Sequence, residues 1–555
     1  MAAPNDIFRK ALALHQGGVL APAQALYAQV LALDPRHFDS LHLMGLALVQ
    51  SGEAAKGVEL IRRAIALRPG FAEAHYNLGN ALLTLGRPAE ALESLRQALA
   101  LKPGDAQCHL EAGNALKDLK RGEEAIAAYD VALRLDPRLA EAHNNRGIAL
   151  RDGGRPDEAL ADYDAALRLR PRYAEAHSNR GNALKELGRL EEALACHDRA
   201  IALRPAYAEA HYNRANALAE MGRSDAALES FDAALRLRPD YAEAQHNKAQ
   251  LLLGLGRFGE GFGLYHWRWK SPAFSSARPP LALPAWDGRA DGPVLLWGEQ
   301  GIGDEILHAS LLSLLPEGLS ATLAVDRRLL AIFRRSFPQV RVIDGALPPE
   351  GHFTAQAALG DLGHLLHADA ARIAARRMPF LRADAARRDG LRLDNPFLAR
   401  RPVCGLSWKS ANKKFGAEKS LRLIDLAPLI ATPGMSFVNL QYGEVEDEIA
   451  EVRAALGVSV HQGEGLDVFN DIDGLLALVD LCDAVLTTSN VTAHLAGALA
   501  KRGVVLAPSG KGCLWYWQGG PNDLWYPSLR RIAQDRAGQW QAAIRMAATA
   551  IKDSP

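Results

Sequence analysis

The stretch DAVLTTSNVTAHLAGALAKRGVVLAP, from Asp483 to Pro508, decides the fold of the second half of the chain. It contains an apolar run of strand length, a polar turn, a helical pattern and a second apolar run, in that order. This order is the strand–helix–strand unit of a parallel sheet. The polar turn follows the carboxyl end of a strand, where open α/β sheets bind ligands and the first N–H groups of a helix attract anions. We therefore expect an anionic ligand at this turn.

The first half of the chain is one unit repeated every 34 residues. Prolines mark the period, at Pro35, Pro69, Pro103, Pro137, Pro171, Pro205 and Pro239. A small residue also recurs once per period where two helices must approach closely, at Gly45, Gly79, Gly113, Gly147, Gly181 and Ala215. A constant period of this length indicates stacked helix pairs.

The repeated segments, such as AEAHYNLGNAL and GRPAEALESLRQALALKP, resemble tetratricopeptide repeats over about residues 4–270. The resemblance implies an α-solenoid of seven to eight repeats in residues 1–270. The array ends in GRFGEGFGLYHWRWK, Gly256 to Lys270, where large aromatic residues replace the small ones. Terminal repeats are atypical because one face meets something other than a repeat, so we expect this end to pack against the next domain.

An asparagine column runs through the repeats and is interrupted by Glu111; a parallel column holds Asn80, Asn114, Asn182 and Asn216. The first column consists of Asn77, Asn145, Asn179, Asn213 and Asn247. Side-chain amides both donate and accept, so a ladder of them along a concave surface can hold an extended peptide backbone. The peptide-O-GlcNAc transferases have such a ladder, and the resemblance implies one here that binds a protein acceptor. The alternative, equally open at this point, is that these amides bond neighbouring helices.

The second half of the chain has a different period. Residues 271–292 are rich in proline and serine, so we interpret them as a linker. From Pro293 onward, apolar strands such as VCGLSW and DAVLTT alternate with helical patterns. This order predicts two doubly wound α/β halves, residues 293–395 and 396–555, that face each other across a cleft.

A glycine loop, GEQGIGD, follows the first predicted strand. Its spacing is G-x-x-G-x-G, whereas dinucleotide sites use G-x-G-x-x-G, and no Lys-Ser or Lys-Thr follows as in a P-loop. These two kinds of nucleotide site are therefore disfavoured.

Four segments in order, GEQGIGDEILHA, GLSWKSANKKFGAEKSL, NLQYG and TTSNVTAHLAGALAKRGVVLAP, resemble the heptosyltransferase-like glycosyltransferases of GT-B fold. The resemblance covers about residues 290–535 and is strongest to the bacterial branch fused to tetratricopeptide repeats, which includes flagellin-modifying enzymes. It implies transfer of a sugar from a nucleotide-sugar, such as CMP-nonulosonate or a UDP-sugar, to Ser or Thr of a protein such as flagellin.

The resemblance also implies roles for individual residues. Asp304 corresponds to the proposed base, and Lys419 corresponds best to the lysine that pairs with the donor phosphate, although Lys409, Lys413 and Lys414 lie in the same loop. The remaining donor-binding residues are expected to be Gln441, Ser489, Asn490, Thr492 and His494. Ser489 and Asn490 stand where the family usually has an Asp-Thr or Asp-Gly pair.

Sugar transfer needs a base for the hydroxyl proton and positive charge for the departing phosphate, and these residue types supply both. Two of these residues also have purely structural interpretations: Asp304 as a helix cap and His494 as a buried histidine with its hydrogen bonds satisfied. The aromatic residues Trp515 to Trp517 either wall the ligand pocket or pack the domain boundary. The D-x-D of Asp471 and Asp473 precedes a helical run, so we interpret it as a cap and predict no metal and no cofactor.

Composition limits the function classes. The formal net charge is zero, which argues against a nucleic-acid partner. The five cysteines form no CxxC pair, and no window approaches the roughly 18 apolar residues that span a bilayer. We expect a cytoplasmic glycosyltransferase; the alternative is a repeat scaffold with a degenerate transferase half.

Overall fold

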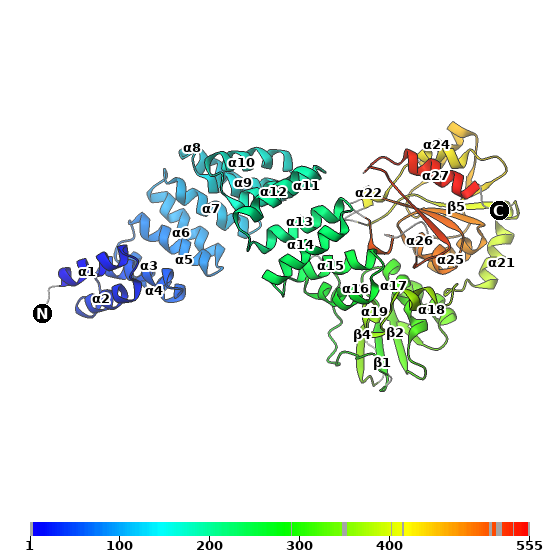
Figure 1. Cartoon of the computed structure of the whole chain (residues 1–555), viewed down its shortest axis with the longest axis horizontal. Coiled ribbons are helices and arrows are strands. Elements are labelled where there is room, and N and C mark those ends of the chain that lie inside the picture. The colour runs from blue at the N-terminus through cyan, green and yellow to red at the C-terminus, as the bar shows by residue number, and fades with distance from the viewer. Residues whose placement is uncertain are drawn as a thin grey trace. The chain divides into compact units, whose positions relative to one another are not determined.

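The computed structural model describes residues 4–272, 274–289, 291–346, 352–400, 402–412, 416–509, 513–517, 524–536 and 538–552 (Figure 1). The chain divides into two compact units, Met1–Ala217 and Leu218–Pro555. Each unit is described by itself.

The first unit is built from antiparallel helix pairs. Its helices are α1 (Pro4–Gln16), α2 (Leu20–Leu33), α3 (Phe38–Gln50), α4 (Ala54–Leu67), α5 (Ala72–Thr84), α6 (Pro88–Leu101), α7 (Ala106–Asp118), α8 (Gly122–Leu135), α9 (Ala140–Asp152), α10 (Pro156–Leu169), α11 (Ala174–Glu186) and α12 (Leu190–Leu203), and α13 (Ala208–Glu220) crosses the division. The predicted α-solenoid of helix pairs is confirmed.

The small-residue column sets the spacing of the two helices in each repeat. A Cβ atom added to Gly113 would lie 2.4 Å from the Tyr129 ring, and one added to Gly181 would lie 2.6 Å from the His197 ring. The turn inside most repeats uses a left-handed glycine, for example Gly86 with φ of 67°. In the repeat that begins at Pro103 this position is Lys120, which adopts a φ of 61°.

The second unit begins with the last repeats, α14 (Ser224–Leu237), α15 (Ala242–Gly254), α16 (Phe258–Tyr265) and the short 3-10 helix η1 (His266–Lys270). Leu253, Phe258, Phe262 and Tyr265 share one hydrophobic core with the helices and strands that follow. The expected packing of the terminal repeat against the next domain is confirmed. The predicted boundaries at residues 270, 292 and 395 stay predictions.

Two parallel sheets form the rest of the second unit. The first has the order β3-β2-β1-β4 and the second the order β10-β9-β8-β5-β6-β7 (Figure 1). The strands are β1 (Val294–Trp297), β2 (Ala321–Val325), β3 (Arg341–Asp344), β4 (Ala355–Ala358), β5 (Val403–Ser407), β6 (Ser436–Asn439), β7 (Val460–His461), β8 (Ala484–Thr488), β9 (Gly503–Ala507) and β10 (Leu529–Ala533). All paired strands are parallel, which confirms the predicted α/β class.

Helices connect these strands. In the first half they are α17 (Ile302–Ala309), η2 (Ser310–Leu314), η3 (Arg327–Leu329), α18 (Leu330–Ser336), η4 (Leu359–Asp361), α19 (Leu362–Leu365), α20 (Ala370–Ala374), α21 (Ala385–Asp394) and η5 (Pro396–Ala399). In the second half they are α22 (Gly416–Lys419), η6 (Leu423–Leu426), α23 (Ala427–Ile430), α24 (Glu446–Leu456), α25 (Ile472–Leu481), α26 (Val491–Ala498), η7 (Trp515–Trp517) and α27 (Gln541–Lys552).

Each sheet has a point where the chain reverses its direction of strand addition. This point lies between β1 and β4 in the first sheet and between β5 and β8 in the second. Ligands of open α/β sheets bind outside the carboxyl ends of the strands at such points. A ligand site is therefore expected at the loops that follow these four strands.

Candidate functional site

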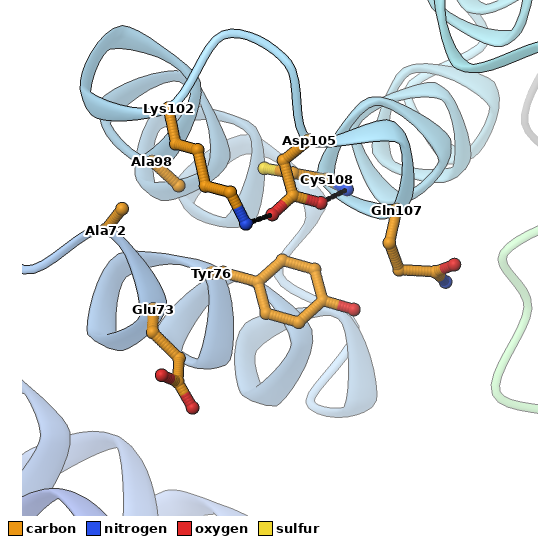
Figure 2. Close-up of a pocket in the computed structure, with 8 residues that line it drawn as sticks. All are labelled: Ala72, Glu73, Tyr76, Ala98, Lys102, Asp105, Gln107 and Cys108. Atoms are coloured by element: carbon orange, nitrogen blue, oxygen red, sulfur yellow. Dashed lines mark hydrogen bonds and ion pairs between the residues drawn. The ribbon is translucent and has the colours of Figure 1, made fainter. Parts of the chain in front are cut away.

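A pocket of about 310 Å³ opens in the first unit between α5, α6 and the start of α7 (Figure 2). Its lining includes the Tyr76 ring, the methyl groups of Ala72 and Ala98, and the ion pair of Lys102 with Asp105, in which Nζ and Oδ2 are 2.9 Å apart.

The asparagine column contacts the first helix of the preceding repeat. The Asn145 amide donates to Asn114 Oδ1 at 2.9 Å, and the Asn179 amide donates to Asn144 Oδ1 at 3.0 Å. The Asn213 amide donates to Ser178 Oγ at 3.3 Å, and the Asn77 amide bonds the His42 ring at 2.9 Å. These bonds support the interpretation that the amides join neighbouring helices. Peptide binding by these four residues and Asn247 stays a prediction.

At the switch point of the second sheet, the Gln441 side chain organises the loop after β5. Its Oε1 accepts hydrogen bonds from Ser407 Oγ at 3.0 Å and from the backbone N–H groups of Trp408 and Lys409 at 2.9 and 2.7 Å. The Asn490 amide donates to Ser407 Oγ at 2.8 Å and to the Lys409 carbonyl at 3.0 Å, and Asn490 Oδ1 accepts from Thr487. Both side chains hold loops together.

The other residues of this turn are also engaged internally. Ser489 Oγ accepts from the Trp517 indole at 2.9 Å, and the Thr492 hydroxyl donates to the Leu440 carbonyl at 3.5 Å. Asn490 is the N-cap of α26 but makes no side-chain cap bond. The first N–H groups of an α-helix have no intrahelical partner, so this helix start can receive an anion.

Lys409 and Lys419, the two described lysines of the loop after β5, differ in whether they have an ion-pair partner. The Lys409 ammonium forms an ion pair with Glu448, which also accepts from the Leu423 backbone. Lys419, by contrast, is only 1% exposed and makes no hydrogen bond or ion pair with any residue in the described segments. Burial lowers the pKa of Lys419, and the negative charge of Asp304 opposes this shift. Lys413 and Lys414 lie outside the described residues.

Asp304 lies in the first turn of α17, whose N-cap is Gly301. Burial, with a further contribution from the charge of Glu299, raises the pKa of Asp304 to about 6. The backbone of Gly301 and the charge of Lys419 favour the ionised form. Asp304 thus occupies the first turn of the helix, where burial makes its ionised form costly, and its role as a base stays a prediction.

His494 on α26 joins the two halves at this point. A Cβ atom added to Gly303 would lie 2.9 Å from His494 Cδ2, so only glycine allows α17 to approach α26 this closely. His494 Nδ1 is 3.0 Å from the Tyr526 hydroxyl. Burial, followed by the charge of Lys419, lowers the pKa of His494 to about 3, so the ring is neutral. This geometry favours the buried-histidine interpretation.

The aromatic residues near the C-terminus pack the boundary. Trp515, Tyr516, Trp517 and Trp525 are each less than 10% exposed. Trp525 packs edge-on against Phe258, with ring centroids 5.9 Å apart, and its indole donates to the Leu307 carbonyl at 3.2 Å. These contacts favour the packing interpretation over a wall around a ligand.

Arg268 and its partners form a buried charge network that no sequence motif predicts. Arg268 is fully buried and donates to both carboxylate oxygens of Glu299, at 2.7 and 3.0 Å, and to Asp361 at 2.7 Å. Glu299 also accepts from the Gly360 N–H at 2.9 Å. This network of buried charges lies at the switch point of the first sheet, because Glu299 follows β1 and Asp361 follows β4. The available signal was a single arginine inside the aromatic run HWRWK.

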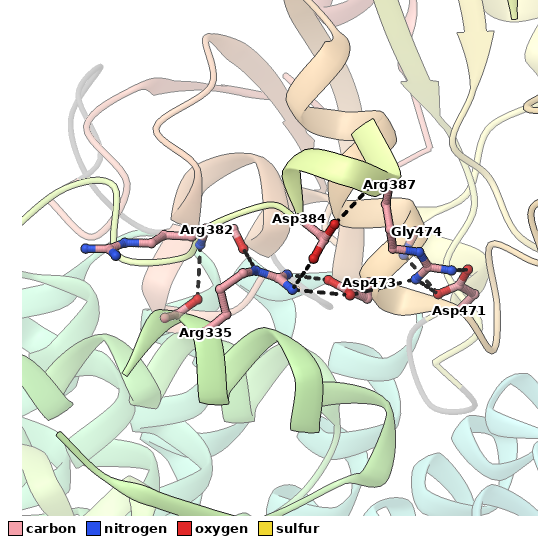
Figure 3. A network of polar contacts seen from close by, with 8 residues as sticks. Arg335, Arg382, Asp384, Arg387, Asp471, Asp473 and Gly474 are labelled. Carbon is pink, nitrogen blue, oxygen red and sulfur yellow. Dashed lines mark hydrogen bonds and ion pairs between the residues drawn. The ribbon is translucent and has the colours of Figure 1, made fainter. Parts of the chain in front are cut away.

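The D-x-D caps a helix, as predicted. Asp471 is the N-cap of α25 and accepts from the Gly474 N–H at 2.9 Å. Figure 3 shows Arg387 against Asp471, and Arg335 between Asp384 and Asp473. The pairs of Arg387 with Asp471 and of Arg335 with Asp473 join the two α/β halves. Within the described segments, no group of three His, Cys, Asp or Glu side chains is arranged around a metal position.

Comparisons with known proteins identify the repeats. Residues 42–106 and 76–140 match one tetratricopeptide-repeat model, residues 149–188 and 181–222 match a TPR-repeat model, and residues 208–241 match a third. Residues 42–140 and 149–241 are therefore tetratricopeptide repeats. Across the described segments, no helix combines the length and the apolar character needed to cross a bilayer.

A curated relative, protein FlbA of Caulobacter vibrioides, is 34% identical over 322 residues, which cover 54% of this chain and 53% of FlbA. The chain thus spans about half the length of this relative. Among solved structures, YrrB, described as a TPR protein with an unusual peptide-binding site, is 28% identical, with 34% of this chain and 98% of YrrB covered and a TM-score of 0.29. MamA is 24% identical, with 32% and 98% covered and a TM-score of 0.28.

Proposed function

We propose that this chain is a GT-B glycosyltransferase that transfers a sugar from a nucleotide-sugar to Ser or Thr hydroxyls of a protein recruited by its repeats. The observation that carries the proposal is the buried ammonium of Lys419, which lacks a partner in the described segments. A buried cation without a counter-ion is costly unless an anion binds it. The diphosphate or monophosphate of a nucleotide-sugar is such an anion.

The chemistry fits the surroundings of Lys419. The charges of Lys419 and Asp304 act on each other, and that of Lys419 also acts on His494 at the start of α26. In the proposed step, the acceptor oxygen bonds to the anomeric carbon while the bond from that carbon to the phosphate oxygen breaks. The electron pair leaves with the phosphate, Asp304 takes the hydroxyl proton, and Lys419 with the helix N–H groups balances the phosphate charge.

The raised pKa of Asp304 suits this role. At a pKa of about 6 the carboxylate is a stronger base than an ordinary aspartate and is still mostly ionised at pH 7. The proposed donor is CMP-nonulosonate or a UDP-sugar, and flagellin is the first acceptor to examine.

A thermal-shift experiment on the full chain tests the donor site. Nucleotides and nucleotide-sugars at about 1 mM should raise the melting temperature if they bind only the folded state. We expect one nucleotide class to give a shift that Lys419→Met abolishes. The control is Lys501→Met, which removes a lysine whose Nζ donates to the Asp480 carbonyl at 2.7 Å. A missing shift in the wild type, or an equal loss in the control, contradicts the proposal.

Cys513 offers a second measurement of the same event. All five cysteines lie in described segments, and only Cys513 is not buried. The charge of Lys419 acts on its thiol. A nucleotide bound at Lys419 should therefore slow the alkylation of Cys513. Asp304→Asn should keep this protection and lose sugar transfer.

A repeat scaffold with a degenerate transferase half is the second candidate. The observation in its favour is that Ser489 and Asn490, which replace the usual carboxylate pair, have their side chains committed to Trp517, Ser407 and Thr487. This candidate predicts no nucleotide shift with any member of the panel.

A further inference from the structure

The loops between consecutive repeats place a cation over an aromatic ring. The guanidinium carbon of Arg170 lies 4.8 Å from the Tyr173 ring centroid, and the pairs Arg204 with Tyr207 and Arg238 with Tyr241 have distances of 4.7 and 4.5 Å. In each pair the ring follows the cation by three residues. Each ring belongs to the segment between the second helix of one repeat and the first helix of the next.

The repeat that begins at Pro103 keeps the cation and lacks the ring. Two periods before Tyr173, and one period before Leu139, the chain has Asp105, and Lys102 takes the position of the arginine. Asp105 caps α7 by accepting from the Cys108 N–H at 3.1 Å. The pocket of about 310 Å³ opens beside this aspartate (Figure 2).

The preceding repeat shows what fills this space elsewhere. There, Phe71 packs edge-on against Phe38 with centroids 5.1 Å apart, and Arg68 lies 4.4 Å from the Phe38 centroid. One period later, these two rings are replaced by Asp105 and Ala72. The pocket is thus lined by the two residues that stand where the preceding repeat has these rings.

The walls of the pocket keep the character of an aromatic site. The Tyr76 ring lies opposite the Lys102–Asp105 pair, and the Glu73 carboxylate points away from it (Figure 2). Ala72 and Ala98 add apolar surface, and the Lys102 ammonium supplies the cation that the face of an aromatic ring attracts. A volume near 300 Å³ is at the lower end for ligand pockets, which suits one side chain of a larger partner.

We propose that this pocket binds a tyrosine or phenylalanine side chain of a polypeptide partner, which supplies the ring that the repeat at Pro103 lacks. The inference rests on the proposed function, because it identifies how the repeats select their acceptor. The same repeat interrupts the asparagine column with Glu111. A column of side-chain amides would bind only the backbone of a peptide, whereas this pocket would also select for one of its side chains.

Two substitutions at one position test the proposal. Asp105→Tyr places in the pocket the ring that the repeats at Pro171, Pro205 and Pro239 have, whereas Asp105→Asn keeps both the helix cap and the open pocket. The matched control is Leu139→Tyr, which adds a ring at the equivalent position of the next repeat. Circular dichroism melting of each variant establishes that the repeats are folded.

The probe is a fluorescein-labelled library of decapeptides in pools, each pool with one residue fixed at the centre. We expect the Tyr and Phe pools to bind the full-length wild type, Asp105→Asn and Leu139→Tyr, and to bind Asp105→Tyr about tenfold more weakly or worse. A preference for the Arg or Lys pools, equal binding to Asp105→Tyr, or no binding by any pool overturns the inference.

The nucleotide experiment separates this inference from the proposed function. A nucleotide shift that persists in Asp105→Tyr while peptide binding is lost supports both. A persistent nucleotide shift with unchanged peptide binding overturns only the pocket. If no nucleotide raises the melting temperature of the wild type, while the wild type still binds the Tyr pools, only the proposed transferase function is overturned.

Discussion

Replacing Arg268 by methionine should destabilise the second unit strongly. Arg268 is fully buried, and the Glu299 side chain that it holds is 3% exposed, whereas the Asp361 side chain is 26% exposed and can be hydrated. The main cost is therefore the uncompensated charge of Glu299. Removing one partner of a buried ion pair costs about 3–5 kcal/mol. For a unit of this size that is a fall of about 4–7 °C in melting temperature.

The pH dependence of the Arg268→Met effect has a definite sign. Burial already raises the pKa of Glu299, and Arg268 opposes this shift, so its loss raises the pKa further. A carboxyl group with a raised folded-state pKa loses stability as the pH rises. The destabilisation should therefore be larger at pH 8 than at pH 5, and Glu299→Gln should restore part of the stability of Arg268→Met.

Differential scanning calorimetry of the full chain at both pH values measures this effect. The control is Arg278→Met: Arg278 is exposed and lies over the Trp269 ring at 4.8 Å. Its loss should cost about 0.5–1 kcal/mol. A fall below about 1 kcal/mol for Arg268→Met, or an equal fall at pH 5 and pH 8, would refute the reasoning.

Two further substitutions test buried titratable groups. Asp304→Asn should raise the stability of the second unit by up to about 3 kcal/mol at pH 8, because burial raises the Asp304 pKa from 3.8 to about 6 and each pKa unit is worth about 1.4 kcal/mol. The gain in stability should shrink at pH 5, and thermal melts at both pH values measure it. His197→Phe should stabilise the first unit by about 1–3 kcal/mol, because neither ring nitrogen of this buried histidine has a hydrogen-bond partner among the described residues and Phe231 stands at the equivalent position. Burial lowers the His197 pKa to about 4, so the wild type should lose stability as the pH falls from 6.5 to 4, and the variant should lose less; urea titrations at both ends measure this.

The sequence by itself determined the architecture of the chain. The period of 34 residues, with a small residue in each period, leaves few alternatives to stacked helix pairs. The alternation of apolar strands with helical patterns similarly predicted two parallel sheets. Both kinds of signal are local, because a helix or strand displays its buried face within one short segment. Asp471 was likewise identifiable as a cap, because its acceptor bond reaches only to Gly474.

Only the tertiary structure decided which polar groups remain available. Lys409 and Lys419 look alike in sequence, yet Lys409 forms an ion pair with Glu448 on α24, whereas Lys419 forms no ion pair within the described segments. Arg268 finds Glu299 and Asp361 at separations of 31 and 93 residues. Pairing over such distances depends on how elements pack together, and no local periodicity encodes it. The repeats therefore encode the fold locally, whereas the absence of a partner for Lys419 among the described residues follows only from how the elements pack.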